Sequence, residues 1–356
     1  MLYLFCTILG AGFHPAQIVK LKRSYYKEYA IIAILLLALV VLNLILGSVI
    51  IPVKDIVSTL LGHHTSDFVS DILFSLRIPK LITALMAGAA LSICGLQMQT
   101  LFKNPLADPY ILGISSGAGL GVAFFVMGVS AFGISMPSSL FFSLGIATSA
   151  WIGAFAITLL ILLVSYRLKD NISLLIFGIM LGSAVSALIS LFQYFSSTSA
   201  LKVFVLWTMG SFTGLNPGQI WVMFFLILTG FALSVYNIKD LNTLLMGEAY
   251  AKSLGVNLEK TRRRILVATT LLAGSVTAFC GPIGFIGIAA PHIARLFFRN
   301  ADHKVLIPAT ALLGAVIMVF ADTAAQLSTP IIPINTVSAL IGVPVILAII
   351  LKNRFV

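Results

Sequence analysis

A serine and a histidine inside an apolar chain are the first residues whose types and spacing suggest chemistry. The stretch Gly113-Ile-Ser-Ser-Gly117 fits the pattern G-x-S-x-G, and His292 is the only histidine inside a predicted span. Together they would suggest an intramembrane serine protease. That pattern describes a serine on a sharp turn from a strand into a helix, and no strand is predicted here. An enzyme is therefore the least favoured interpretation.

Asp322 is the one acidic residue deep in a predicted span, and Gln326 follows four positions later. Carboxylates inside a membrane are costly and mark functional sites by default. A proton-coupled transporter usually needs such a group at mid-depth, whereas Asp322 lies about a turn and a half from the outer end of its helix. Two interpretations stay open: proton coupling, and hydrogen bonding between Asp322 and Gln326 that braces the outer mouth.

Nucleotide and metal sites are not expected in this chain. A phosphate-binding loop requires Gly-Lys followed by Ser or Thr, and none of the 28 glycines precedes a lysine. If ATP drives the protein, ATP and magnesium bind to another subunit. Cys6, Cys94 and Cys280 lie far apart, which disfavours a disulfide framework or a thiolate metal site. We expect no cofactor here and no catalytic residue.

Composition indicates that lipid surrounds most of the chain. Of 356 residues, 60% are hydrophobic and 9% are charged, whereas a soluble protein carries roughly 25% charged residues. The net charge of +11 could suggest nucleic acid. The basic residues, however, sit between apolar runs, as topology signals and lipid contacts do. We therefore expect membrane lipid as a partner and no nucleic acid.

The apolar runs predict an all-α, polytopic membrane protein with about ten transmembrane helices. A spanning helix needs roughly 20 apolar residues. One transmembrane domain is expected over 29–356, after a loosely ordered leader over 1–28. The predicted spans, of which the eighth is short and glycine-rich, lie near 29–50, 80–102, 110–127, 139–164, 171–194, 217–236, 263–280, 284–298, 305–327 and 334–351.

Basic residues predict the orientation. With the amino terminus inside, only Lys54, Arg77, Lys80 and Lys202 of the 22 lysines and arginines lie outside. This bias places both termini in the cytoplasm of a bacterium whose inner membrane holds the chain. Two connections are long: the outer segment 51–79 predicts a short amphipathic helix, and the inner segment 237–264 predicts a polar helical hairpin that serves as a docking surface.

Glycines recur at helical spacing within the spans. Gly113, Gly117 and Gly121 are four residues apart, and Gly178 with Gly182 repeats the spacing. Small residues let helix backbones approach closely in lipid. We interpret these rows as packing surfaces, within one bundle or between two copies.

Several long stretches, in order, resemble one family. Arg77-Ile-Pro-Lys80 leading into LITALMAGAALSICGLQMQTLFKNPLADPYILGISSGAGLG is similar to the second and third spans of FecCD-type ABC importer permeases. LLMGEAYAKSLGVNLEKTRRR resembles their cytoplasmic coupling loop. GPIGFIGIAAPHIARLF and INTVSALIGVPVILAIILK resemble their last third. The resemblance runs from about residue 35 to 353.

The resemblance implies the type II importer architecture, with ten spans per subunit and two copies around one pathway. It also implies two cytoplasmic ATPases, one periplasmic binding protein, and a cargo of iron-siderophore, haem or cobalamin, among which the sequence does not choose. The pathway is expected along Ile172 to Tyr194, the third span and the region from Gly281 to Gly287. Carried over, the ATPase-coupling residues are Leu245, Gly247, Glu248, Ala249, Leu254, Gly255, Val256 and Arg262.

The family's outer docking arginines map onto Arg77 and Lys80, and Gln326 stands at a third docking position where the family has arginine. That departure removes one docking contact. The alternative for Arg77 and Lys80 is ordinary snorkelling at a helix end. We expect an importer that works by alternating access. An ion-coupled secondary transporter is the alternative, and it would show mid-membrane charges or broken inverted repeats.

Overall fold

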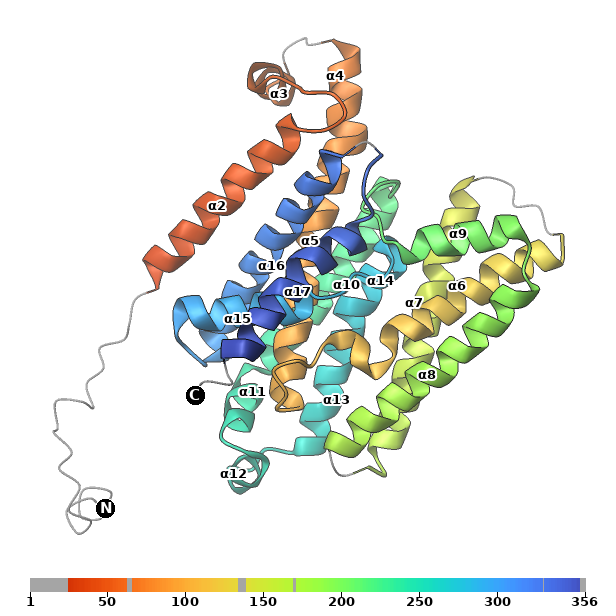
Figure 1. Cartoon of the computed structure of the whole chain (residues 1–356). Coiled ribbons are helices and arrows are strands. Elements are labelled where there is room, and N and C mark those ends of the chain that lie inside the picture. The colour runs from red at the N-terminus through yellow and green to blue at the C-terminus, as the bar shows by residue number, and fades with distance from the viewer. Residues whose placement is uncertain (1–24, 63–65, 134–138, 169–170, 329, 353–356) are drawn as a thin grey trace.

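The computed structural model describes residues 25–62, 66–133, 139–168, 171–328 and 330–352, which are nearly all helical and contain no strand (Figure 1). The predicted all-α fold is confirmed. Eight helices or helix runs are long and apolar enough to cross a bilayer. They are α2 (Tyr26–Ile45), the run Asp67–Leu101, α6 (Ile114–Ala131), α7 (Ser139–Ser165), α8 (Asn171–Phe195), α10 (Pro217–Tyr236), the run Leu258–Cys280 and α16 (His303–Gln326).

The other two predicted spans are shorter apolar helices, α15 (Ile286–Phe298) and α17 (Ile334–Lys352). α15 has 13 residues, which at 1.5 Å per residue gives about 20 Å. The hydrocarbon core is roughly 30 Å thick, so α15 is too short to cross it alone. Gly281, at φ 77°, ends the preceding helix as the sequence predicts. Each of the ten predicted spans therefore corresponds to a helix.

Two of the long runs extend beyond the predicted spans. The run over 67–101 joins α4 (Asp67–Asp71), the π-helix η2 (Ile72–Arg77) and α5 (Ile78–Leu101). The prediction captured only its inner part, because its outer third carries charges that a hydrophobicity pattern assigns to a loop.

The second run joins α13 (Leu258–Thr269), the π-helix η4 (Thr270–Gly274) and α14 (Ser275–Cys280). It begins five residues before the predicted start because Asn257 caps it: its Oδ1 accepts from the Lys260 N–H at 3.0 Å.

Short helices fill the connections. α3 (Val53–Leu60) is the amphipathic helix expected in the outer connection, and α11 (Ile238–Leu245) with α12 (Glu248–Ser253) forms the expected inner hairpin. The 3₁₀ turn η3 (Pro109–Leu112) leads into α6. α9 (Thr198–Thr208) was not predicted.

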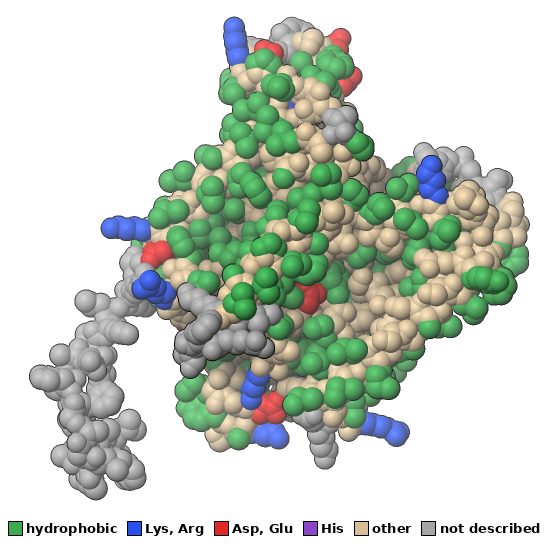
Figure 2. Space-filling model, in the orientation of Figure 1, with side chains coloured by type: hydrophobic (Ala, Val, Ile, Leu, Met, Phe, Trp, Pro, Cys, Tyr) green, Lys and Arg blue, Asp and Glu red, His purple; other side chains and the backbone are tan. Residues whose placement is uncertain are grey.

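α5 lies at the centre of the bundle. It packs along α16 and also contacts α15, α10 and α13, while α6 and α7 pair beside it and α8 flanks them (Figure 1). α2 lies against α16 at the periphery. On the face shown in Figure 2, charged side chains gather at the two ends of the molecule and beside the start of α2, and hydrophobic side chains dominate between them. This distribution suits a bundle surrounded by lipid.

Glycines set the distances between these helices. A Cβ on Gly95 would lie 1.7 Å from the Gly287 carbonyl oxygen, and one on Gly88 would lie 2.3 Å from the Gly314 oxygen. No side chain fits there, so α5 meets α15 and α16 backbone to backbone. Such contact is how helices attract one another where lipid removes the hydrophobic effect between them.

The predicted glycine rows pack inside one chain. A Cβ on Gly121 would lie 2.0 Å from the Ser149 oxygen of α7, and one on Gly117 would lie 2.6 Å from the Gly153 oxygen. Gly113, at φ 77°, joins η3 to α6 and faces α8. The rows therefore hold α6 between α7 and α8.

We predict that Gly95→Ala destabilises the protein by at least about 3 kcal/mol, the upper end of overpacking costs. The added methyl group meets backbone, which cannot rotate away. Gly128→Ala is the matched control, because nothing lies within 4 Å of its Cβ position. Thermal unfolding of the purified variants in detergent measures the difference. Equal melting temperatures for Gly95→Ala and wild type would contradict this account of helix packing.

Candidate functional site

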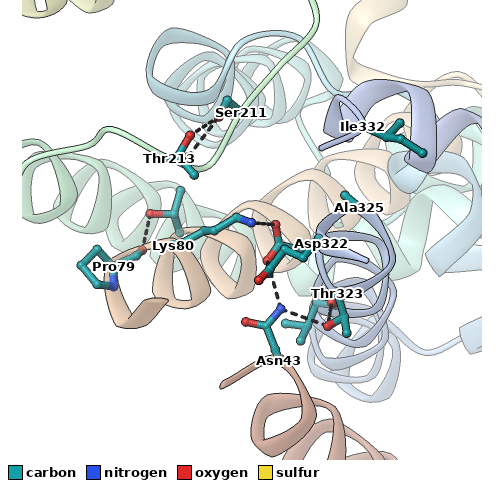
Figure 3. Close-up of polar contacts among 12 residues, drawn as sticks. Asn43, Pro79, Lys80, Ser211, Thr213, Asp322, Thr323, Ala325 and Ile332 are labelled. Atoms are coloured by element: carbon teal, nitrogen blue, oxygen red, sulfur yellow. Dashed lines mark hydrogen bonds and ion pairs between the residues drawn. The ribbon is translucent and has the colours of Figure 1, made fainter. Parts of the chain in front are cut away.

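Asp322 lies at the centre of a polar cluster formed by α2, α5 and α16 (Figure 3). This end of the bundle, opposite the α11–α12 hairpin, is called the outer end below. The Asp322 side chain is 3% exposed, and the Lys80 Nζ lies 2.9 Å from its Oδ1. Its Oδ2 accepts from Asn43 Nδ2 at 3.0 Å and from Gln326 Nε2 at 2.6 Å. Both carboxylate oxygens therefore have partners.

The cluster joins three helices that are distant in sequence. Lys80 comes from α5, Asn43 from α2, and Asp322 with Gln326 from α16. Asn43 Nδ2 also donates to Thr323 Oγ1 at 2.9 Å. Sequence reasoning paired Asp322 with Gln326 and missed Asn43, although a lone amide within the first apolar span was a signal. Since an unpaired buried charge is far more costly than a paired one, the contacts stabilise the meeting of the three helices.

Arg77 closes the end of α2. Its guanidinium donates to the carbonyl oxygens of Leu44, Ile45 and Val49, the Ile45 contact being 3.0 Å. The last carbonyls of a helix have no partner within it, so Arg77 supplies what the end of α2 lacks. Arg77 is 7% exposed.

The predicted docking residues Arg77 and Lys80 use their charges within the bundle. The sequence interpretation takes Arg77 and Lys80 as charges presented outward, with Gln326 as a third position. The structure directs both charges into the bundle and places Gln326 in the same cluster. Docking through these residues stays a prediction, and it would require the two charges to leave the partners described above.

The α11–α12 hairpin turns at two glycines. Gly247 has φ 110° and Gly255 has φ 81°, and nothing lies within 4 Å of a Cβ at either position. Gly255 makes a left-handed turn, and its N–H donates to the Lys252 oxygen at 2.9 Å. Val256 is half-buried and closes the turn, with its N–H 3.0 Å from the Ala251 oxygen.

The tip of the hairpin exposes apolar side chains. Leu245 is 46% exposed and Leu254 56%, and Met246 and Tyr250 between them are exposed as well. Ala249 is also at the surface. On the other face, Leu241 and Leu244 are buried and fix the hairpin to the bundle. An exposed apolar tip on a charged segment is typical of a protein contact surface.

Two of the predicted coupling residues face inward. Arg262 is 5% exposed, and its Nη1 donates to the Leu168 oxygen at 3.0 Å. It therefore supports the hairpin from within and offers no surface charge. Glu248 Oε1 accepts from Asn171 Nδ2 at 2.6 Å. Sequence spacing identified the hairpin but not which of its charges are inward.

The serine and histidine of the protease interpretation lie in different settings from those that the interpretation requires. The G-x-S-x-G stretch lies at the start of α6, after a 3₁₀ turn and not after a strand. His292 Nε2 lies 2.9 Å from the Pro105 carbonyl oxygen. Among the residues that the structure describes, no group of three or more His, Cys, Asp or Glu side chains is placed to hold a metal ion.

The chain is similar to known transport proteins. The model of the FecCD transport family matches residues 35–352. A vitamin B12 import system permease protein of Salmonella schwarzengrund is 38% identical over 283 residues, which cover 79% of this chain and 83% of that protein. A protein of the same description from Citrobacter koseri is 37% identical over 284 residues, with the same coverage.

Solved structures give the same result. A chain described as an inward-facing conformation of a metal-chelate type ABC transporter matches with a TM-score of 0.79 and 31% identity, covering 92% of this chain and all of that one. PsaBC from Streptococcus pneumoniae, in complex with Fab, matches with a TM-score of 0.51 at 14% identity, covering 82% of this chain and 94% of that one. The second likeness concerns the fold alone.

We predict that Lys80→Met costs roughly 3–5 kcal/mol, because it leaves the Asp322 charge buried without its cation. Adding Asp322→Asn to Lys80→Met should restore most of that stability, since the amide oxygen still accepts from Asn43 and Gln326. Lys202→Met, at an exposed lysine of α9, is the control. Detergent melting curves compare the variants, and a double variant no more stable than Lys80→Met would refute the ion-pair account.

Proposed function

This chain belongs to the FecCD transport family, and from that membership we propose that it is the membrane-spanning subunit of an ATP-driven importer for a bulky metal chelate. The observation that carries the proposal is the apolar tip of the hairpin, with Leu245 and Leu254 about half exposed. The tip lies on the face that the basic residues assign to the cytoplasm, in a chain without a nucleotide-binding loop. A separate ATPase would cover this tip and supply ATP and magnesium.

The pathway is proposed to run along α8 between two copies of the chain. Only 17% of the apolar window of α8 is buried in one subunit. Ser183, Ser186 and Ser190 lie on one exposed face, each hydroxyl donating to the carbonyl four residues earlier at 2.9–3.0 Å. Because these hydroxyls donate within their own helix, they would give the pathway a mildly polar lining. A second subunit would enclose this lining. A periplasmic binding protein would deliver the cargo at the outer end.

The relatives and the lining both support a chelate as cargo. Relatives 37–38% identical are described as vitamin B12 permeases, and a 31% identical structure as a metal-chelate transporter. A chelated metal presents its organic shell to the wall, so hydroxyl and apolar groups suffice to pass it. We propose a corrinoid or a ferric chelate as cargo, carried by alternating access.

An ion-coupled transporter is favoured less. Coupling to protons needs a carboxylate that gains and loses a proton during transport. Asp322 is held by an ammonium group and two amides. These contacts tie α16 to α2 and α5, which suits a brace and not a proton carrier.

Reconstitution with its partner ATPase and binding protein tests the function. Proteoliposomes holding the complex should import labelled cyanocobalamin or a labelled ferric siderophore only when ATP is inside and the loaded binding protein is outside. An imposed proton or sodium gradient without ATP should drive nothing. Import driven by the gradient alone would refute the proposal, and the preferred cargo identifies the chelate.

The double variant Leu245→Asp with Leu254→Asp tests in the same assay whether the ATPase covers the hairpin tip. Covering these side chains with an ATPase would bury two carboxylates at high cost, so ATPase binding and import should fall at least about ten-fold. The membrane bundle should melt as in wild type, because both side chains are already exposed. Lys260→Asp, on the exposed side of α13, is the control for added acidic charge. Unchanged ATPase binding would mean that the tip is not the contact.

Orientation has its own test. In a background without Cys6, Cys94 and Cys280, a cysteine at Lys202 should react with an impermeant thiol reagent in intact cells, and one at Lys260 should not. Both side chains are exposed in the structure, so reactivity reports sidedness. The reverse labelling pattern would overturn the orientation from which the hairpin is called cytoplasmic.

A further inference from the structure

The last turn of α5, from Gln99 to Leu101, is joined to both helices of the hairpin by buried polar side chains. All three residues of this turn are at most 5% exposed. One relay reaches it from α11 and another from α12. Neither relay was anticipated from the sequence.

The first relay runs from Asn242 of α11 through His303 of α16 to Thr100 of α5. Asn242 Oδ1 lies 2.9 Å from the His303 backbone N and 2.8 Å from His303 Nδ1. His303 Nε2 lies 2.9 Å from Thr100 Oγ1. His303 is 1% exposed, so water does not replace these contacts.

The partners of Asn242 determine the proton positions. Its Nδ2 lies 2.6 Å from Asp302 Oδ1, a carboxylate that only accepts, and its Oδ1 accepts from a backbone N–H. The amide orientation is thereby fixed. His303 Nδ1 must then carry the proton that it donates to Oδ1, and its Nε2 must accept. The Thr100 hydroxyl lies 2.9 Å from this nitrogen and 2.9 Å from the Leu96 carbonyl oxygen of its own helix, so its single proton is shared between the two acceptors.

The second relay runs from Glu248 of α12 through Asn171 of α8 to α5. Asn171 Nδ2 lies 2.6 Å from Glu248 Oε1 and 2.9 Å from the Leu101 carbonyl oxygen. Leu101 follows Thr100 directly. The two relays therefore end on adjacent residues, although they start on different helices of the hairpin.

The same turn borders a cavity and is bonded to α15. A cavity of about 360 Å³ beside this turn is lined by Gln99 and Thr100 of α5, by Leu244 and Leu245 of α11, and by Arg295 of α15. Gln99 Oε1 accepts from Arg295 Nη1 of α15 at 2.6 Å. The turn of α5 therefore meets α11 and α15 around one shared cavity.

We propose that the last turn of α5 is the junction through which movement of the hairpin reaches the membrane bundle. Asn242, His303, Thr100 and Asn171 are positioning residues: they touch no cargo and no nucleotide. α5 then carries the displacement as one rod to its outer end, where Lys80 meets Asp322. The inference rests on the proposed function, since it assumes that an ATPase moves the hairpin.

Thr100 offers the sharpest test because its side chain can be changed without changing its shape. Thr100→Val removes the hydroxyl that donates to His303, and Thr100→Ser keeps it. Thr83→Val is the control on the same helix, because the Thr83 hydroxyl donates only to the Pro79 carbonyl of its own helix, at 2.8 Å. The readouts are import per ATP hydrolysed, basal ATP hydrolysis and melting temperature of the full importer, with labelled cyanocobalamin or ferric siderophore as cargo.

Thr100→Val should import at least about five-fold less per ATP, the lower end of ordinary coupling factors. Basal hydrolysis should match wild type, and Thr100→Ser and Thr83→Val should stay coupled. The melting temperature of Thr100→Val should fall only modestly, because the buried His303 Nε2 loses its donor. Asn171→Ala, which cuts the second relay, should lower the same ratio. A merely structural role would lower the melting temperature and leave import per ATP unchanged.

Three results would overturn the proposal: wild-type import per ATP in Thr100→Val, an equal loss in Thr83→Val, or an equal loss in Thr100→Ser. Failure of the proposed function looks different, because then the wild-type complex itself shows no ATP-dependent import. The two failures are therefore separable within one set of proteoliposomes.

Discussion

The structure depends on how closely the backbone of α5 approaches its neighbours. At Gly88 and Gly95 the approach to α16 and α15 leaves no room for even a Cβ atom. In lipid such contact provides much of the attraction between helices, since apolar side chains gain little by leaving one apolar medium for another. The other helices arrange themselves around this core, and α5 is consequently the most enclosed of the long spans.

Polar contacts hold the two ends of α5, whereas the glycines hold its middle. The middle of the helix is held by shape, the outer end by an ion pair with amide donors, and the inner end by the two relays. Each polar group is costly in this setting unless it has a partner. The partners come from α2, α8, α11, α12 and α16, so the satisfaction of a few polar atoms fixes helices that are far apart in sequence. Position along α5 thus decides which kind of contact is used.

Sequence alone was sufficient for the spans, the hairpin and the family, because these are carried by long, strongly patterned segments. Hydrophobic runs show where a helix lies but not where it ends. The outer third of the 67–101 run and the start of α13 were therefore misjudged. The sequence also does not show whether a charged side chain points to the surface or into the bundle. Arg77 and Arg262 were predicted to be surface groups, yet both donate to backbone carbonyls inside the protein. The relay from Asn242 to Thr100 joins helices separated by about 140 residues, and one sequence holds no signal of that meeting.

The contacts of Arg77 and Lys80 impose an order on how the chain assembles in the bilayer. The acceptors of Arg77 belong to the end of α2 and to the residues just after it, so α2 and α5 can enter the membrane as a hairpin with the guanidinium already satisfied. Lys80 has no such neighbour, because Asp322 arrives only when α16 is made. A charge costs least near the end of a span. There the ammonium group can reach interfacial water on its long side chain until α16 inserts and completes the pair.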